Sequence, residues 1–80
     1  MKNYAFDNEI DIFLKNISYL RKHNKLSKRK MAEILGIGVK SLNKIENGEL
    51  PPRIGVNVFF KIEKNFGISP KNLFSGLLDR

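Results

Sequence analysis

Side chains that can hydrogen-bond to nucleic-acid bases recur at helical spacing in the middle of the chain. Lys40, Asn43, Lys44 and Asn47 lie three or four residues apart, and Val39 precedes them. Residues at this spacing share one face of a helix. In the major groove of DNA, lysine can donate to guanine O6 and N7, asparagine can pair with adenine through two hydrogen bonds, and valine can pack on the thymine methyl group. This run of residues could therefore read bases.

The other residues of the segment indicate how such a helix would be held. Leu42 and Ile45 fall on the side opposite the polar residues. We therefore expect a helix over about 39–47 with these two residues facing the core. A polar helical face is usually in contact with water alone, and these residues by themselves leave that alternative open.

The composition argues against several classes of protein. The chain has 80 residues, which is enough for a single domain (1–80). It has no cysteine and a single histidine, His23, so we expect no disulfide, no metal site and no cofactor. The acidic residues show no paired spacing, and no phosphate-binding glycine loop is present. We therefore do not expect an enzyme.

The distribution of apolar residues predicts where the protein works. No apolar run approaches the roughly 18–20 residues of a membrane span. Acidic residues occupy the place where a secretory signal needs an apolar stretch. We expect a cytoplasmic protein with no membrane partner, and no small-molecule effector domain is evident.

Positive charge is concentrated in the middle of the chain. The net charge is +7, and residues 21–48 hold eight of the basic residues against two acidic ones. A local excess of this kind indicates a polyanionic partner, which could be DNA, RNA or an acidic membrane surface. A basic cluster begins this region, and its members are Lys22, Lys25, Lys28, Arg29 and Lys30.

Glycine and proline residues divide the chain into five segments, each of which predicts a helix. The predicted helices cover about 8–23, 28–35, 39–46, 53–66 and 70–78. Ser27 and Ser69 are natural N-caps, and Gly36 and Gly67 can end the helices that precede them. Apolar residues recur at three- and four-residue spacing along the first and fourth helices. With no credible strand, we predict an all-α domain of five short helices.

The second and third predicted helices are separated only by a short turn around Gly36. Two short helices joined in this way describe a helix-turn-helix, here at about 27–47. Ala32 is small at the point where the two helices would cross. Gly36 would make the turn, and Ile37 would reach from the turn into the core.

A longer pattern extends this motif in both directions. Its elements are Leu20-Arg21, Leu26-Ser27, Met31-Ala32, Leu35-Gly36-Ile37, Ser41-Leu42, Ile45-Glu46-Asn47-Gly48, Pro52, Ile62, Phe66-Gly67-Ile68-Ser69 and Leu73. With these residues the chain resembles the lambda-repressor-like proteins, which are the Cro/repressor-type, or XRE, family of helix-turn-helix DNA-binding proteins. The resemblance spans 20–73, and residues 1–7 would form a short N-terminal extension. The spacing from Leu26 to Gly48 fits without gaps.

The resemblance implies how the domain would dock on DNA. The second helix would cross the backbone and the third, the recognition helix, would lie in the major groove. Arg21 and Glu46 match an ion pair that ties the first helix to the third. The resemblance implies that Ser27 and Lys28 contact phosphate. It implies base contacts by Val39, Lys40 and Lys44, with Asn43 beside them, and a contact of Ser41 with a phosphate or a base. Contacts with the DNA backbone are implied for Asn47 and Arg53.

The chain departs from the family pattern at three places. Gly38 stands where the family usually has a serine or threonine that caps the recognition helix, and glycine supplies no hydroxyl. Glu63 stands where the family usually has a buried alanine. The first helix also begins about one turn early.

The function that the resemblance implies is transcriptional regulation. We expect a repressor that binds double-stranded DNA as a homodimer on a pseudo-palindromic operator, with Leu77 and Leu78 of the fifth helix as the candidate dimer surface. An antitoxin or anti-repressor that mainly binds a protein is an alternative. An RNA-binding or membrane-surface module could use the basic cluster. Single-strand binding is less favoured, because only Tyr4, Phe6, Tyr19 and Phe60 lie off the core stripes and could stack on bases.

Overall fold

The computed structural model describes the backbone of residues 5–78 and the side chains from Glu9 to Leu78. Five helices follow one another: α1 (Ala5–His23), α2 (Lys28–Leu35), α3 (Val39–Glu46), α4 (Val56–Phe66) and α5 (Pro70–Ser75). The described residues contain no strand. The predicted all-α fold of five helices is therefore confirmed.

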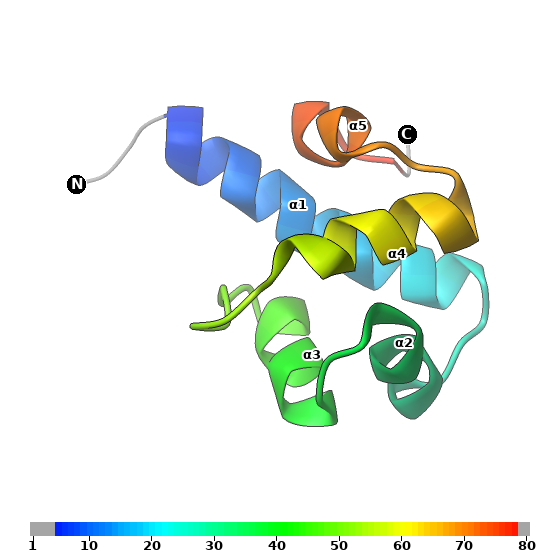
Figure 1. Cartoon of the computed structure of the whole chain (residues 1–80). Helices are drawn as coiled ribbons and strands as arrows, with labels where there is room; N and C mark the ends of the chain where they lie inside the picture. Colours follow the sequence, from blue (N-terminus) through cyan, green and yellow to red (C-terminus); the bar gives the residue numbers. More distant parts are fainter. Residues whose placement is uncertain (1–4, 79–80) are drawn as a thin grey trace.

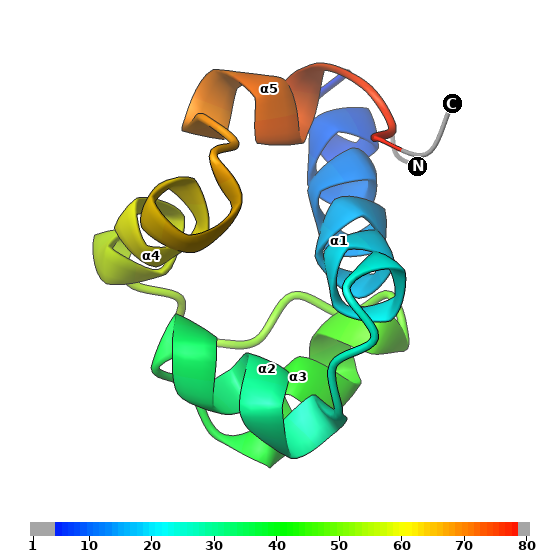
Figure 2. The same cartoon turned by 90° about the vertical axis from the view of Figure 1, so that its right-hand side faces the viewer.

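The helices surround a single core. α1 packs against both α3 and α5, and α2 packs against both α3 and α4. Figure 1 and Figure 2 show α2 and α3 together at one edge of the molecule, with α5 at the opposite edge. This arrangement leaves one side of the helix-turn-helix without a covering element among the described residues.

Apolar side chains from all five helices fill the space between them. The buried set is Phe13, Leu14, Ile17, Leu20, Met31, Ala32, Leu35, Leu42, Ile45, Val58, Ile62 and Leu73. Between α1, α4 and α5 the ring of Phe13 stacks on that of Phe74 with their centroids 5.0 Å apart, and the Phe59 ring centroid lies 5.5 Å from that of Phe13. Eight-residue helices such as α2 and α3 are too short to persist alone, so this packing must supply their stability.

Local signals in the sequence account for the helix boundaries at α2 and α5. The hydroxyl of Ser27 accepts a hydrogen bond from the Lys30 N–H at 3.0 Å, and that of Ser69 accepts from the Asn72 N–H at 3.4 Å. Gly38 is the extended N-cap residue that precedes α3, and it has no side chain to cap the helix. A Cβ placed on Gly38 would meet nothing within 4 Å. The structure therefore has room for a serine or threonine at this position.

Three predicted boundaries were wrong. α1 begins at Ala5, earlier than about residue 8, so residues 5–7 belong to the helix and not to an extension. α4 begins at Val56, not near Arg53, because Gly55 takes the extended N-cap position. Glycine costs about 1 kcal/mol inside a helix but is well tolerated at the N-cap. α5 ends at Ser75, short of Leu78, because Gly76 is extended at φ 176°.

A buried asparagine holds the C-terminal segment against α1. Asn16 is fully buried, and its amide donates to the carbonyl oxygens of Leu73 at 2.8 Å and Gly76 at 3.0 Å. Its own oxygen accepts from the Leu78 N–H at 2.9 Å. Asn16 thereby binds the end of α5 and the residues after it, a role that the sequence reasoning missed. The signal for it was a polar residue inside the apolar stripe of α1.

Neither a membrane span nor a metal site is found among the described residues. Within residues 5–78, none of the helices combines the length and apolar character needed to cross a bilayer. Among the described side chains, no three acidic, histidine or cysteine residues converge as a metal site would require.

Glu63 of α4 stands where the family usually has a buried alanine. Its side chain is exposed here, so the helix accommodates it without burying its charge.

Candidate nucleic-acid interface

The two sides of α3 differ sharply in exposure. Leu42 and Ile45 are 0% and 1% exposed, as predicted for the side that packs on the core. On the outer side, Val39, Lys40, Lys44 and Asn47 are all exposed. Four of the side chains predicted to contact DNA are thus gathered on one accessible helical face, which we call the α3 outer face.

A tight turn sets α2 against α3. Gly36 has φ 73°, in the left-handed region that favours glycine, and the Ile37 N–H donates to the Ala32 carbonyl at 3.0 Å. Ala32 is buried where the helices cross, and Ile37 packs against the core cluster. A larger residue in place of Ala32 would separate the two helices and change the direction of α3.

The ion pair expected between Arg21 and Glu46 is present and mostly buried. Arg21 Nε lies 2.5 Å from Glu46 Oε2, and Nη2 lies 3.0 Å from Oε1, so the contact is bidentate. Arg21 Nη1 also donates to the Leu26 carbonyl at 3.0 Å. Their side chains are 15% and 8% exposed. One guanidinium therefore fixes the end of α1, the loop before α2 and the last turn of α3 relative to one another.

The same contact shifts the pKa of Arg21. Its hydrogen bonds to the Glu46 carboxylate raise the pKa of Arg21 above its ordinary value, and this outweighs the opposing effect of burial. The group stays protonated at every pH at which the protein would bind nucleic acid. The pair thus stabilises the charged guanidinium that joins α1 to α3.

The entry to α2 presents positive charge beside α3. Ser27, Lys28 and Arg29 are exposed, and the Ser27 hydroxyl is already used to cap the Lys30 N–H. The remaining N–H groups at the start of a helix carry partial positive charge and suit an anion. Lys28 is therefore an exposed cation at the first position of α2, and its contact with phosphate stays a prediction.

Asn43 differs from its neighbours on α3. Its side chain is half-buried, and its Oδ1 atom is buried without a hydrogen-bond partner among the described residues. An amide in this position cannot present both of its polar atoms to a base without turning. Asn43 is therefore less accessible than the residues of the α3 outer face, and its expected place beside the base contacts stays a prediction.

The remaining predicted residues lie around this face to different extents. Lys44 Nζ is 3.8 Å from Glu49 Oε1 in an exposed pair, which partly neutralises the charge that Lys44 would offer. Ser41 is half-buried, and Arg53 is exposed in the segment between α3 and α4.

The two candidate dimer residues lie after α5 and differ in exposure. Leu77 is exposed, whereas Leu78 is half-buried and packs on the core cluster. Of the two dimer candidates, only Leu77 is available.

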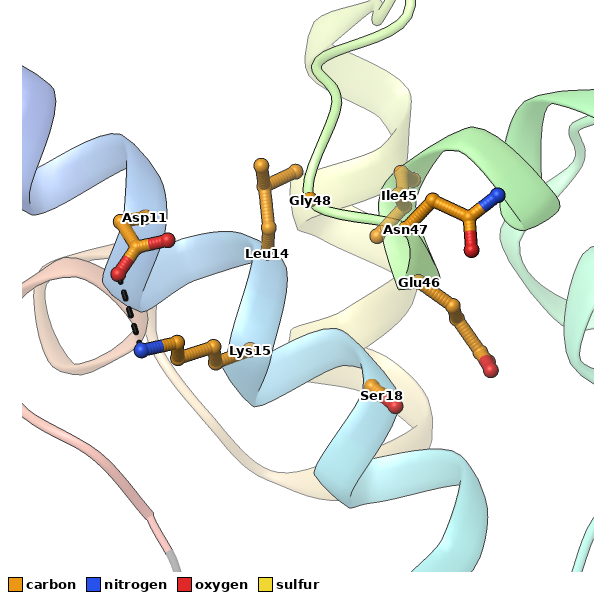
Figure 3. Close-up of a pocket in the computed structure, with 8 residues that line it drawn as sticks. All are labelled: Asp11, Leu14, Lys15, Ser18, Ile45, Glu46, Asn47 and Gly48. Atoms are coloured by element: carbon orange, nitrogen blue, oxygen red, sulfur yellow. Dashed lines mark ion pairs between the residues drawn. The ribbon is translucent and has the colours of Figure 1, made fainter.

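A pocket of about 350 Å³ lies between α1 and the end of α3. Figure 3 shows that its walls come from Asp11, Leu14, Lys15 and Ser18 of α1 and from the stretch Ile45, Glu46, Asn47 and Gly48. Asp11 pairs with Lys15 at 3.1 Å, and Glu46 pairs with Arg21. Both carboxylates of the pocket are therefore engaged in ion pairs, and the arrangement suits support of α3 better than acid–base chemistry.

The turn, the buried back of α3 and its exposed outer face together match a known family. A family model described as a helix-turn-helix domain matches residues 14–77. The chain therefore belongs to the helix-turn-helix domain family, as its resemblance to the lambda-repressor-like proteins implied. No curated protein and no solved structure matches the chain.

Proposed function

We propose that this protein is a sequence-specific double-stranded DNA-binding transcriptional regulator whose helix α3 enters the major groove. The observation that carries the proposal is the α3 outer face, which is accessible and bears two lysines, an asparagine and a valine with no acidic side chain among them. Each of these residue types has a complementary feature on a base edge. A helix fits in the major groove, whose width of about 12 Å matches its diameter.

The other contacts follow from this placement. Lys28 at the start of α2 and Arg53 after α3 are both exposed, and we propose that they contact the phosphates alongside the groove. The Arg21–Glu46 pair and the Gly36 turn hold the two helices in one orientation, so the free protein already has the shape that docking requires. Binding then needs little reorganisation of the backbone.

The finer parts of the proposal are the homodimer and the repressor role. α3 has only eight residues and reads too few bases for useful specificity alone, so we propose that two copies bind half-sites about one helical turn apart. The exposed Leu77 near the end of α5 is the proposed contact. A protein of this kind would repress by occupying its operator. Sedimentation of a monomer in the presence of operator DNA would contradict the dimer.

Two lysine variants test the docking on a duplex selected by the wild-type protein. Lys44→Ala is expected to weaken binding by about 1–3 kcal/mol and to relax the preference at one base position, because a base contact is lost. Lys28→Ala is expected to weaken binding to all duplexes and to reduce the slope of log K against log salt by about one. Fluorescence anisotropy at several salt concentrations measures both effects.

The matched control is Lys71→Ala. Lys71 is an exposed lysine of α5, at the edge of the molecule opposite α2 and α3 (Figure 1), so its loss should change affinity little. If all three variants bound like the wild type, the docking would be wrong. Stronger binding to an RNA duplex or to anionic lipid vesicles than to DNA would favour the alternatives that the basic cluster left open.

A further inference from the structure

Four of the helices are followed, within two residues, by a residue with left-handed backbone conformation. One of these four residues is not glycine. After α2, α3 and α4 the residues are Gly36, Gly48 and Gly67, with φ of 73°, 84° and 72°. After α1 the corresponding residue is Lys25, with φ 56°. Side chains disfavour this region because Cβ approaches the backbone too closely.

The end of α1 has the same hydrogen bonds as the ends of α2 and α3. The Lys25 N–H donates to the Lys22 carbonyl at 3.1 Å, and the Leu26 N–H donates to the Arg21 carbonyl at 3.0 Å. Gly36 with Ile37, and Gly48 with Glu49, repeat this pair of bonds. All three are Schellman motifs, in which glycine is the usual residue at the left-handed position. The chain uses glycine there twice, and lysine once.

Nothing among the described residues explains this lysine as a structural element. Lys25 is exposed, and its ammonium group makes no ion pair or hydrogen bond with the part of the chain that the structure describes. A strained residue that makes no compensating contact points to a role in binding. The fold alone would be served better by glycine.

The surroundings of Lys25 indicate the kind of ligand. Six basic residues and no acidic one lie between Arg21 and Lys30. Lys25 directly precedes the Leu26-Ser27 entry to α2, and both views show the turn from α1 running down to the edge formed by α2 and α3 (Figures 1 and 2). Arg21 is committed to Glu46, and Lys30 lies 3.6 Å from Glu33. Lys22, Lys25, Lys28 and Arg29 have no such acidic partner among the described residues.

We propose that Lys25 is a DNA-phosphate contact, retained in place of glycine because its charge extends the interface from the start of α2 onto the α1–α2 turn. This rests on the proposed function, since it requires that α2 and α3 dock on a duplex. Ser27, Lys28 and Lys25 would then follow one strand of the backbone. The lysine lowers the stability of the free protein and raises its affinity for DNA.

Opposite shifts in stability and affinity test the assignment. Lys25→Gly is expected to raise the melting temperature by about 2–6 °C, because the left-handed residue is no longer strained. On a labelled duplex of mixed sequence near 0.1 M salt it should weaken binding about five- to tenfold and reduce the salt slope by about 0.9, the effect of one phosphate contact. Lys25→Asn should act in the same direction, since asparagine tolerates this backbone conformation. Lys25→Arg should keep the wild-type affinity and slope.

The controls separate this assignment from the proposed function. Lys71→Asn removes an equal charge at the opposite edge and should leave both affinity and slope unchanged. If Lys25→Gly bound like the wild type while Lys28→Ala bound more weakly with a reduced slope, DNA docking would stand and the role of Lys25 would be overturned. If the wild-type protein did not bind duplex DNA at all, both would be overturned.

Discussion

Replacing Asn16 with leucine is expected to lower the free energy of unfolding by about 3 kcal/mol, because three backbone groups lose their partner at once. The leucine side chain has the same branched shape and number of heavy atoms but can neither accept from the Leu78 N–H nor donate to the carbonyls of Leu73 and Gly76. Leu73 is fully buried, so its carbonyl would find no water in exchange. Urea denaturation followed by circular dichroism measures the change.

The control for this prediction is another asparagine of the same chain. Asn65 donates one exposed hydrogen bond to the Lys61 carbonyl within α4, so Asn65→Leu should change the free energy of unfolding by less than about 0.5 kcal/mol. Hydrogen exchange at residues 76–78 should also become faster in Asn16→Leu, since Asn16 holds this segment against α1. A loss below about 1 kcal/mol would mean that Asn16 does not secure the segment.

The second large effect is expected at the ion pair behind α3. Glu46→Gln should lower the free energy of unfolding by about 2–4 kcal/mol, because the mostly buried Arg21 keeps its charge and loses the carboxylate that neutralises it. The Leu26 carbonyl alone cannot replace that carboxylate. The same variant should also bind DNA less well, since the last turn of α3 is no longer fixed to α1.

A double-mutant cycle isolates the contribution of the pair itself. Combining Glu46→Gln with Arg21→Met removes the unpaired charge, so the double variant should be more stable than the sum of the single changes predicts. Asp11→Ala provides the surface comparison. Asp11 and Lys15 are 52% and 63% exposed, and breaking such a pair costs about 0.5 kcal/mol or less. Strictly additive effects of the Arg21 and Glu46 changes would show that the two side chains do not act as a unit.

Helices bounded by strong local signals were predictable from the sequence. Ser27 and Gly36 delimit α2, and the turn they define places α3 at once. The stripe that contains Leu42 and Ile45 gave the orientation of α3, and hence the residues of its outer face. These features depend on neighbouring residues, and local spacing reports them directly.

The features that were missed depend on contacts between distant segments. The capture of residues 73–78 by Asn16 joins positions about sixty apart in the chain. A polar residue in the apolar stripe of α1 marks Asn16 as unusual, but no local pattern identifies its distant partners. The capture also explains why α5 ends at Ser75 although Leu77 and Leu78 continue an apolar spacing. The start of α4 was missed for a different reason: Gly55 can serve either as a helical residue or as an N-cap, and only the path after Pro51 decides between them.

Within the site, the residue types were predictable but their accessibility was not. Helical spacing placed Asn43 among the residues that could read bases, yet its oxygen is buried. Lys44 was predicted to contact bases, and the nearby Glu49 carboxylate was not foreseen. Lys25 appeared only as one charge among several, because its backbone conformation is visible only in the three-dimensional fold.

Selection of binding sites from random duplex DNA tests the central claim most directly. If α3 reads the major groove, the wild-type protein should enrich a short motif. If two copies bind together, the motif should occur as two inverted half-sites about one helical turn apart. Lys44→Ala should enrich the same motif with one position relaxed. A pool that stays random after repeated rounds, or a motif unchanged by the loss of Lys44, would contradict the proposal that α3 is the reading helix.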